Sequence, residues 1–219
     1  MPSRPSRATH DPRVARVRLP LRTRRLDLVR PSGRWGSQAI GLLNDFEVSR
    51  WLLHVPHPYG RSDLKDFLRM VRESLPNDPH LRLWLVERRT GRLVGGMGLH
   101  RIDPVHRRAE LGYWIGRPYW RRGFGFEAGT AVVRLAFNTL GLHRLEAATF
   151  DGNRPSQRLL RKLGFRFEGV RPDSFYLHGR WVADVQFGRV NRGERRRGRG
   201  PRGRPSRGGS RGAAGARGD

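Results

Sequence analysis

The sequence Trp120-Arg121-Arg122-Gly123-Phe124-Gly125-Phe126-Glu127-Ala128 decides the fold that we predict for this chain. It lies between a strand-like run, residues 109–115, and a helix-like run that reaches about residue 139. The two glycines let the backbone turn tightly and bring its amides close to a ligand. Because such a loop before a helix directs unbonded amides and the helix dipole at an anion, we predict a pyrophosphate site here. The two arginines add positive charge.

The loop departs from the two common nucleotide-binding motifs. The dinucleotide motif G-x-G-x-x-G requires a third glycine where this chain has Ala128, and no acidic residue is evident where a ribose contact is expected. The phosphate loop G-x-x-x-x-G-K-[ST] of nucleotide hydrolases is absent. The pyrophosphate therefore belongs to another class of cofactor.

Segments downstream of the loop identify that class. They are His143-Arg144-Leu145-Glu146-Ala147-Ala148-Thr149, Asp151-Gly152-Asn153-Arg154-Pro155-Ser156, Leu159-Leu160-Arg161-Lys162-Leu163-Gly164-Phe165 and Glu168-Gly169. Together with the loop, they resemble the GNAT superfamily of N-acetyltransferases over about residues 25–190, and within it the Rim-type (ribosomal-protein-alanine N-acetyltransferase-like) branch. The resemblance implies acetyl-CoA as co-substrate and the acyl-CoA N-acyltransferase fold.

The coarse pattern of the chain agrees with that fold. Strands are predicted at residues 26–30, 81–87, 93–101, 108–115, 144–150, 165–170 and 181–190. Helices are predicted at residues 35–44 and 45–53, from an N-cap at Ser62 to about residue 75, after Gly125, and between Pro155 and Gly164. The sum is an α/β fold with a mixed, largely antiparallel sheet flanked by helices.

The resemblance also implies which residues contact the cofactor. The pyrophosphate would lie on the loop formed by Arg121, Arg122, Gly123, Phe124, Gly125 and Phe126. Asn153 would hydrogen-bond the pantetheine arm, although Asp151-Gly152-Asn153 is also a typical turn. Backbone groups of Trp114, Ile115 and Gly116 would meet the same arm, because in this family their strand splays from its neighbour.

Acetyl transfer requires a deprotonated amine, a polarised thioester and a stabilised or protonated thiolate. Since the chain has no cysteine, direct attack in a ternary complex is favoured over a cysteine acyl-enzyme. Glu110 is the candidate base, because histone-type members of the family have a glutamate at the matching strand position. The alternatives are a base made of waters, and a structural ion pair between this carboxylate and an arginine such as Arg108.

Ser156 is the candidate acid, since the resemblance places its counterpart beside the CoA sulfur in the Rim-type branch. The alternative is an ordinary hydrogen bond at the start of a helix. Many relatives instead use a tyrosine seven residues after the asparagine, where this chain has Leu160. The glutamate proposed as base in some Rim-type enzymes corresponds to Phe175, and this departure favours Glu110.

Positive charge is concentrated at the two ends of the chain. The net charge is +26, of which residues 1–25 supply eight Arg minus one Asp, +7, and residues 191–219 supply ten Arg minus two acids, +8. We predict a disordered extension over residues 1–24, an acetyltransferase domain over 25–190 and a disordered Arg/Gly-rich tail over 191–219. The tails either dock on RNA or the ribosome, or only keep the protein soluble.

The acceptor is harder to predict than the cofactor. A basic core disfavours cationic small molecules, so a protein N-terminal amine, ribosomal or other, is favoured over a polyamine or an aminoglycoside. A nucleic-acid-binding protein on an acetyltransferase-like scaffold is the non-enzymatic alternative. Candidate acceptor-side residues are Trp51, His54, Trp84, His100, Tyr176, Trp181 and Asp184. The sequence leaves the oligomeric state open.

The remaining composition points to an ordinary protein of the cytoplasm. The chain has no cysteine and its eight histidines lack ligand spacing, so we expect neither disulfides nor a metal site. No apolar run reaches about 18 residues, so no membrane span is expected.

Overall fold

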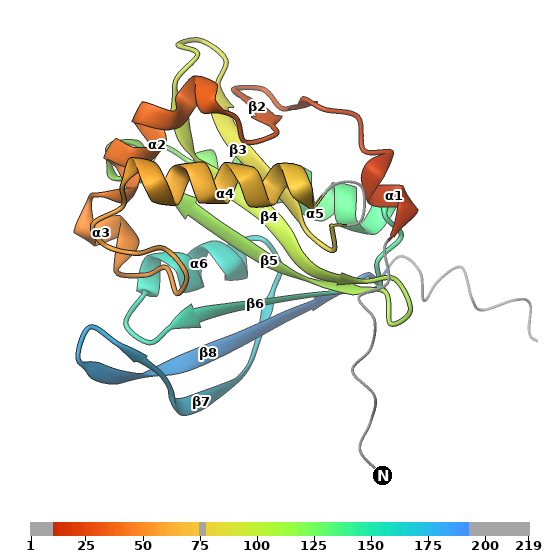
Figure 1. The fold of residues 1–219 in the computed structure, drawn as a ribbon. Helices are drawn as coiled ribbons and strands as arrows, with labels where there is room; N and C mark the ends of the chain where they lie inside the picture. Colours follow the sequence, from red (N-terminus) through yellow and green to blue (C-terminus); the bar gives the residue numbers. More distant parts are fainter. Residues whose placement is uncertain (1–10, 75–77, 193–219) are drawn as a thin grey trace, which may run out of the picture.

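The computed structural model describes residues 11–74 and 78–192 and contains one eight-stranded sheet (Figure 1). The strands are β1 (Leu21–Arg22), β2 (Leu26–Val29), β3 (Leu81–Glu87), β4 (Leu93–Asp103), β5 (Arg108–Ile115), β6 (Arg144–Phe150), β7 (Arg166–Leu177) and β8 (Arg180–Val190). Their order is β1-β2-β3-β4-β5-β6-β8-β7, and every neighbouring pair is antiparallel except β5 and β6, which run parallel. The predicted mixed, largely antiparallel α/β fold is confirmed.

Helices cover both faces of the sheet (Figure 1). They are α1 (Pro12–Ala15), α2 (Gly36–Leu43), α3 (Phe46–Ser49), α4 (Arg61–Glu73), α5 (Phe124–Arg134) and α6 (Arg154–Lys162), with 3-10 turns η1 (Gly33–Trp35) and η2 (Arg117–Tyr119) and a π-helical turn η3 (Leu135–Thr139). The main core joins α5 and α6 to one face through residues such as Val132, Leu160 and Leu111. Helices α2 and α4 pack on the other face around Trp84 and Leu93.

The start of α4 differs from the sequence prediction. We expected Ser62 as the N-cap, but the N-cap is Gly60 and the helix begins at Arg61. The carboxylate of Asp63 accepts a hydrogen bond of 2.7 Å from the Gly60 amide. The prediction was wrong because an acidic residue in the first turn can satisfy the helix start from inside, without a capping side chain before it.

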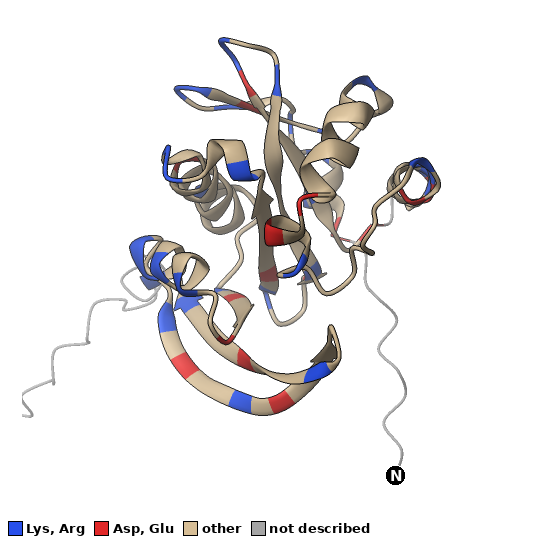
Figure 2. Cartoon of the chain, turned by 90° about the vertical axis from the view of Figure 1, so that its left-hand side faces the viewer, with Lys and Arg blue, Asp and Glu red and all other residues tan. Residues whose placement is uncertain are grey.

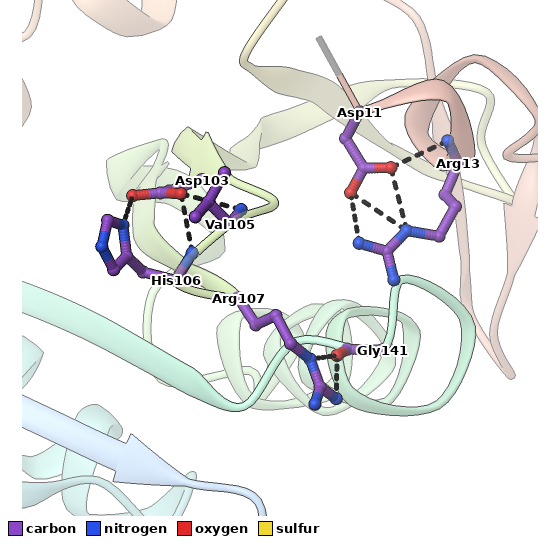
Figure 3. A network of polar contacts seen from close by, with 7 residues as sticks. All are labelled: Asp11, Arg13, Asp103, Val105, His106, Arg107 and Gly141. Atoms are coloured by element: carbon purple, nitrogen blue, oxygen red, sulfur yellow. Dashed lines mark hydrogen bonds and ion pairs between the residues drawn. The ribbon is translucent and has the colours of Figure 1, made fainter. Parts of the chain in front are cut away.

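The N-terminal segment also differs from the prediction, which treated residues 1–24 as disordered. The structure describes residues 11–24, where Val14 and Val17 are buried in the main core. Asp11 caps α1 and binds the Arg13 side chain, which lies beside the Gly141 turn after η3 (Figure 3). Buried apolar residues among many arginines help to anchor this segment. Residues 1–10 and the tail from residue 193 lie outside the described residues.

No helix among the described residues is long and apolar enough to cross a membrane.

Candidate active site

The parallel strands β5 and β6 open a gap in the middle of the sheet. They pair only from Arg108 with Arg144 to Glu110 with Glu146, although β5 continues to Ile115 and β6 to Phe150. Beyond these pairs the two strands diverge, and α6 starts beside the opening (Figure 1). The splaying that the family resemblance implied is therefore present in this chain.

The glycine loop ends at this opening. Gly123 has φ +79° and is the N-cap of α5, and Arg121 before it is also left-handed, with φ +58°. The first hydrogen bond of the helix runs from the Glu127 amide to the Gly123 carbonyl, over 3.1 Å. The preceding amides of Phe124 and Phe126 have no partner within the helix, because the first turn of any helix leaves such groups unbonded. This loop has the donors that an anion requires.

Helix α6 runs beside α5 in the same direction. A Cβ on Gly125 would lie 3.0 Å from Leu159, and one on Gly129 would lie 2.6 Å from Leu163. The positive ends of both helix dipoles therefore lie at the same end of the molecule. The structure adds a packing role for Gly125 to the predicted approach of a ligand, because its missing side chain makes room for α6.

Asn153 and Ser156 are brought together at the start of α6. The Asn153 carbonyl oxygen Oδ1 accepts a hydrogen bond of 3.2 Å from the Ser156 amide, so Asn153 is the N-cap of this helix. The Ser156 hydroxyl Oγ lies 2.7 Å from the hydroxyl of Tyr113 on β5. Leu160, at the position where relatives have a tyrosine, is fully buried.

Tyr113 is a site residue that the sequence analysis missed. Burial raises its pKa to about 12, against the opposing effect of the hydrogen bond with Ser156, so the phenol stays protonated at neutral pH. In the sequence Tyr113 belongs to an alternating core-facing run with Leu111 and Ile115. A search for phenols on the splayed strand would have found it, but its pairing with a serine 43 positions away depends on the tertiary fold.

Glu110 is the last residue of β5 that pairs with β6, and 28% of its side chain is exposed. Its carboxylate forms an ion pair with Arg101, and not with Arg108, which lies 3.7 Å from Asp103. Across the sheet, Glu110 is opposite His100 on β4. Glu110 therefore lies directly before the residues of β5 that separate from β6.

The end of β5 is more constrained than we expected. The Ile115 carbonyl accepts a hydrogen bond of 2.6 Å from the Trp120 indole, and the Gly116 amide donates to the Val94 carbonyl over 2.9 Å. The indole of Trp114 lies against Gly96, where a Cβ would come within 2.5 Å of it. These two backbone groups already have protein partners, so contacts of this segment with a pantetheine arm would use its other groups.

A histidine pair lies on the α4 side of the opening. The Nδ1 atoms of His80 and His100 are 3.3 Å apart, and the His100 ring covers Gly112, the residue after Leu111. Burial, followed by the positive charges nearby, lowers the pKa of His100 to about 4, and burial also lowers that of His80. Both are therefore neutral at physiological pH. Arg82 and Arg101 contribute to this effect.

The other acceptor-side candidates are scattered. Trp84 is buried in the second core, whereas Tyr176 and Trp181 pair edge to face on the exposed tip of the β7–β8 hairpin. Asp184 is buried, contacts Arg171 and accepts a hydrogen bond of 2.6 Å from Gln186. Of the two roles left open for Asp184, the contacts favour bracing the hairpin.

Comparisons with known proteins agree with this geometry. The acetyltransferase (GNAT) domain profile matches residues 25–166. The chain is 45% identical over 97 residues to the uncharacterized N-acetyltransferase YoaA of Bacillus subtilis (strain 168), covering 44% of this chain and 55% of that protein. It is 39% identical over 71 residues to the ribosomal protein uS5-alanine N-acetyltransferase of Escherichia coli (strain K12), covering 32% of this chain and 37% of the relative. These alignments thus span about half or less of each relative.

A solved structure extends the likeness to the whole domain. The spermidine N-acetyltransferase from Vibrio cholerae in complex with CoA and spermine superposes with a TM-score of 0.68 at 18% identity, over 77% of this chain and 96% of that one. At this identity the likeness concerns the fold alone. Together with the profile match, the splayed strands and the glycine loop, it leads to one conclusion: this chain belongs to the GNAT acetyltransferase family, in its Rim-type branch.

Proposed function

We propose that the protein is an acetyl-CoA-dependent N-acetyltransferase that acetylates a primary amine, best a protein N-terminal amine, by direct attack in a ternary complex. The observation that carries the proposal is the meeting of three features at the splayed strands. These are the amide-rich start of α5, the start of α6 and the hydrogen-bonded hydroxyls of Tyr113 and Ser156. Each supports one part of the reaction.

The cofactor site fits a pyrophosphate. The amides of the α5 first turn, Arg121 and Arg122 would hold the phosphates, aided by the dipoles of both helices. Asn153 uses its oxygen to cap α6, which leaves its amide NH₂ as the group that would donate to the pantetheine arm. Bound acetyl-CoA supplies the activated acetyl group, and the protein supplies position and charge.

The hydroxyl pair suits the leaving group. The ordinary pKa of a thiol is about 8.5, whereas that of Tyr113 is raised to about 12, so a thiolate does not remove the phenol proton. Ser156, oriented by Tyr113, would instead donate a hydrogen bond that stabilises the sulfur as negative charge develops there. Glu110 would accept the proton of the attacking ammonium, directly or through water.

The charges near the opening favour an acceptor with a single positive charge. Arg82 and Arg101 lie close enough to His100 to lower its pKa, and Arg101 pairs with Glu110. A polyamine would have to bring several positive charges to this region. A protein N-terminus brings one. The spermine complex of the Vibrio relative makes the polyamine class the proper competitor in any test.

Two variants of Gly123 test the cofactor site. Both Asn and Asp tolerate the left-handed backbone of this position and have nearly the same shape, but Asp adds a negative charge at the N-cap of α5. We expect Gly123→Asn to keep most of the acetyl-CoA affinity and Gly123→Asp to bind at least ~10-fold more weakly, since like charges repel. Calorimetric titration measures both. Equal acetyl-CoA affinities of the two variants would show that no anion binds at the start of α5.

The acceptor class is tested by CoA release. Peptides with free N-termini, including those of ribosomal proteins, are compared with spermidine and an aminoglycoside at equal concentration. We expect turnover with peptides and not with their N-acetylated forms. If only spermidine is acetylated, the acceptor is a polyamine and not a protein N-terminus. Acetyl-CoA binding without turnover on any amine would favour the non-enzymatic alternatives.

A further inference from the structure

Helix α6 carries a row of basic side chains on its outer face. Arg154, Arg158, Arg161 and Lys162 are exposed, and apart from the adjacent Arg161 and Lys162 they are spaced three, four, seven or eight positions apart, so they lie on one side of the helix. Leu159, Leu160 and Leu163 lie on the opposite side and pack in the core. Figure 2 shows this helix with basic residues and no acidic ones.

The row is not explained by the high arginine content of the chain. Helix α4, which is also amphipathic and exposed, intersperses its basic residues with Asp63, Asp66 and Glu73, and Asp66 pairs with Arg69 over 2.8 Å. Helix α6 contains no acidic residue. Within the described part of the chain, no carboxylate lies in ion-pair range of Arg158 or Lys162.

Part of the row opposes the stability of its own helix. Like charges four positions apart, such as Arg154 with Arg158 and Arg158 with Lys162, each cost a few tenths of a kcal/mol. Arg154 lies in the first turn, where the helix dipole is positive and a basic side chain is unfavourable. Arg161 and Lys162 lie in the last turn, where positive charge is favourable, and Arg161 also lies over Phe187. Arg154 and Arg158 have no such stabilising position, so their charges favour an external anion.

The row continues beyond the helix into a groove of about 1070 Å³. Arg161, Arg166, Arg189 and Arg192 line it, together with Phe137 and the carboxylate of Glu168, which is paired with Arg144. Arg189 is committed to the fold, because it donates to the Leu163 carbonyl and lies over Phe137. Arg166 is exposed and has no acidic partner among the described residues.

The groove lies at the opposite end of α6 from the proposed cofactor site. Since α5 and α6 run in the same direction, their last turns meet here, while their first turns meet at the splayed strands. The chain also leaves the described domain at this point: Arg192 lines the groove, and the Arg/Gly-rich sequence of residues 193–219 follows it directly. The basic face of α6 therefore leads into the groove, and the tail sequence begins directly after the groove residue Arg192.

We propose that the outer face of α6 and Arg166, together called the α6 basic row, bind the phosphate backbone of RNA independently of acetyl transfer. Guanidinium groups in a fixed helical spacing suit several phosphates at once, and arginine matches phosphate geometry with paired hydrogen bonds. Sequences of arginine and glycine such as the tail are typical of segments that bind RNA without sequence preference. Continuity with this tail favours RNA over an acidic protein surface.

The test uses the full chain and two matched triple variants. Arg158→Gln/Lys162→Gln/Arg166→Gln removes three charges from the α6 basic row, and Arg61→Gln/Lys65→Gln/Arg72→Gln removes the same residue types from exposed positions of α4. Both variants keep the tail and the proposed catalytic residues, and both lose the same net charge. Binding of a fluorescein-labelled 20-nucleotide single-stranded RNA is measured by anisotropy over a range of salt concentrations.

We expect the α6 variant to bind this RNA ~10-fold more weakly at moderate salt, with a slope of log affinity against log salt that is smaller by about 2 for three lost phosphate contacts. The α4 variant should resemble the wild type. Acetyl-CoA affinity and peptide acetylation should be unchanged in both variants. The RNA-binding result is measured separately, so it does not depend on which amine is the acceptor.

Four outcomes would overturn the proposal. Equal weakening in the two variants would mean that net charge alone binds RNA, and unchanged binding in the α6 variant would leave the tail or nothing as the RNA site. A selective loss of acetyl-CoA affinity in the α6 variant would make the row part of the cofactor site. Competition by poly-glutamate of equal length, as effective as unlabelled RNA, would assign the surface to acidic proteins.

Discussion

At the scale of single residues, the hydrogen bond of 2.7 Å between Tyr113 and Ser156 is the contact with the clearest chemical consequence. Removing the Ser156 hydroxyl leaves the developing thiolate without its proposed donor. We expect Ser156→Ala to lower kcat by about 100-fold and to leave acetyl-CoA affinity within twofold, in the range seen when one preorganised donor is lost. Steady-state kinetics and calorimetry measure the two effects.

Tyr113→Phe separates orientation from donation. The serine keeps its proton but loses the partner that orients it, so a smaller loss, about 10-fold in kcat, is expected. If Ser156→Ala reduces affinity and turnover by the same factor, Ser156 is only a binding residue. If Tyr113→Phe is fully active, the hydrogen bond between Tyr113 and Ser156 has no role in turnover.

His100 predicts how stability depends on pH. Its pKa falls from 6.5 to about 4 on folding, so the unfolded chain binds a proton more readily between these values. Stability from this group is complete above pH 6.5 and decreases as the pH falls toward 4, by about 3 kcal/mol in total at 1.36 kcal/mol per pKa unit. Denaturant unfolding at pH 7 and pH 4.5 should therefore show a smaller pH dependence in His100→Gln than in the wild type.

The matched control is His178→Gln on the exposed hairpin. This variant should keep the pH dependence of the wild type. If His100→Gln also keeps it, acidic residues and not the buried histidine pair account for the acid sensitivity.

At the scale of elements, the close approach of α5 and α6 depends on glycine. A Cβ at position 129 would lie 2.6 Å from the Leu163 side chain, whereas one at Gly41, on the exposed side of α2, would meet no atom within 4 Å. We expect Gly129→Ala to destabilise the protein by about 1–3 kcal/mol through overpacking. Gly41→Ala should stabilise it by about 0.5–1 kcal/mol, because alanine favours helix.

Thermal unfolding of the two alanine variants measures these opposite signs. A Gly129→Ala variant as stable as the wild type would mean that the two helices can move apart without loss. The first turns of α5 and α6 form the proposed cofactor site. The acetyl-CoA affinity of the Gly129→Ala variant therefore reports whether the contact between the helices also positions that site.

At the scale of the whole molecule, Glu127 connects the N-terminal segment to the glycine loop. Its carboxylate accepts hydrogen bonds from the Thr23 hydroxyl and the Arg25 amide, each 2.6 Å, and from the Arg25 side chain, 2.7 Å. Burial raises the pKa of Glu127, but these bonds outweigh it and hold the pKa below its ordinary value. The bonded carboxylate therefore stabilises the fold at neutral pH, and its contribution decreases as the pH falls through the lowered pKa.

We expect Glu127→Ala to lower the free energy of unfolding by about 1–3 kcal/mol, because two partners lose their acceptor. Hydrogen exchange should accelerate at residues 23–26 before it does so in the central strands. Exchange that increases evenly over the whole domain would show that the contact supports global stability and does not specifically hold this segment.

The sequence by itself determined the family, the order of the main elements from β2 onward and the glycine loop, because these depend on local patterns. The bounds of β3, β5 and β6 follow from alternating apolar residues, and the glycines and arginines of the loop are adjacent in the chain. The same locality explains the failures. Ser62 was a plausible cap in isolation, and the two buried valines of residues 11–24 were hidden among charged neighbours.

Only the tertiary structure decided which distant residues meet. It paired Tyr113 with Ser156 and Glu127 with Arg25, and it gave Gly125 a role in helix packing. Each of these contacts joins elements far apart in the chain, and their positions depend on how the helices pack on the sheet. Side-chain type and spacing predict which groups are present, but distance, burial and pKa are properties of the packed fold.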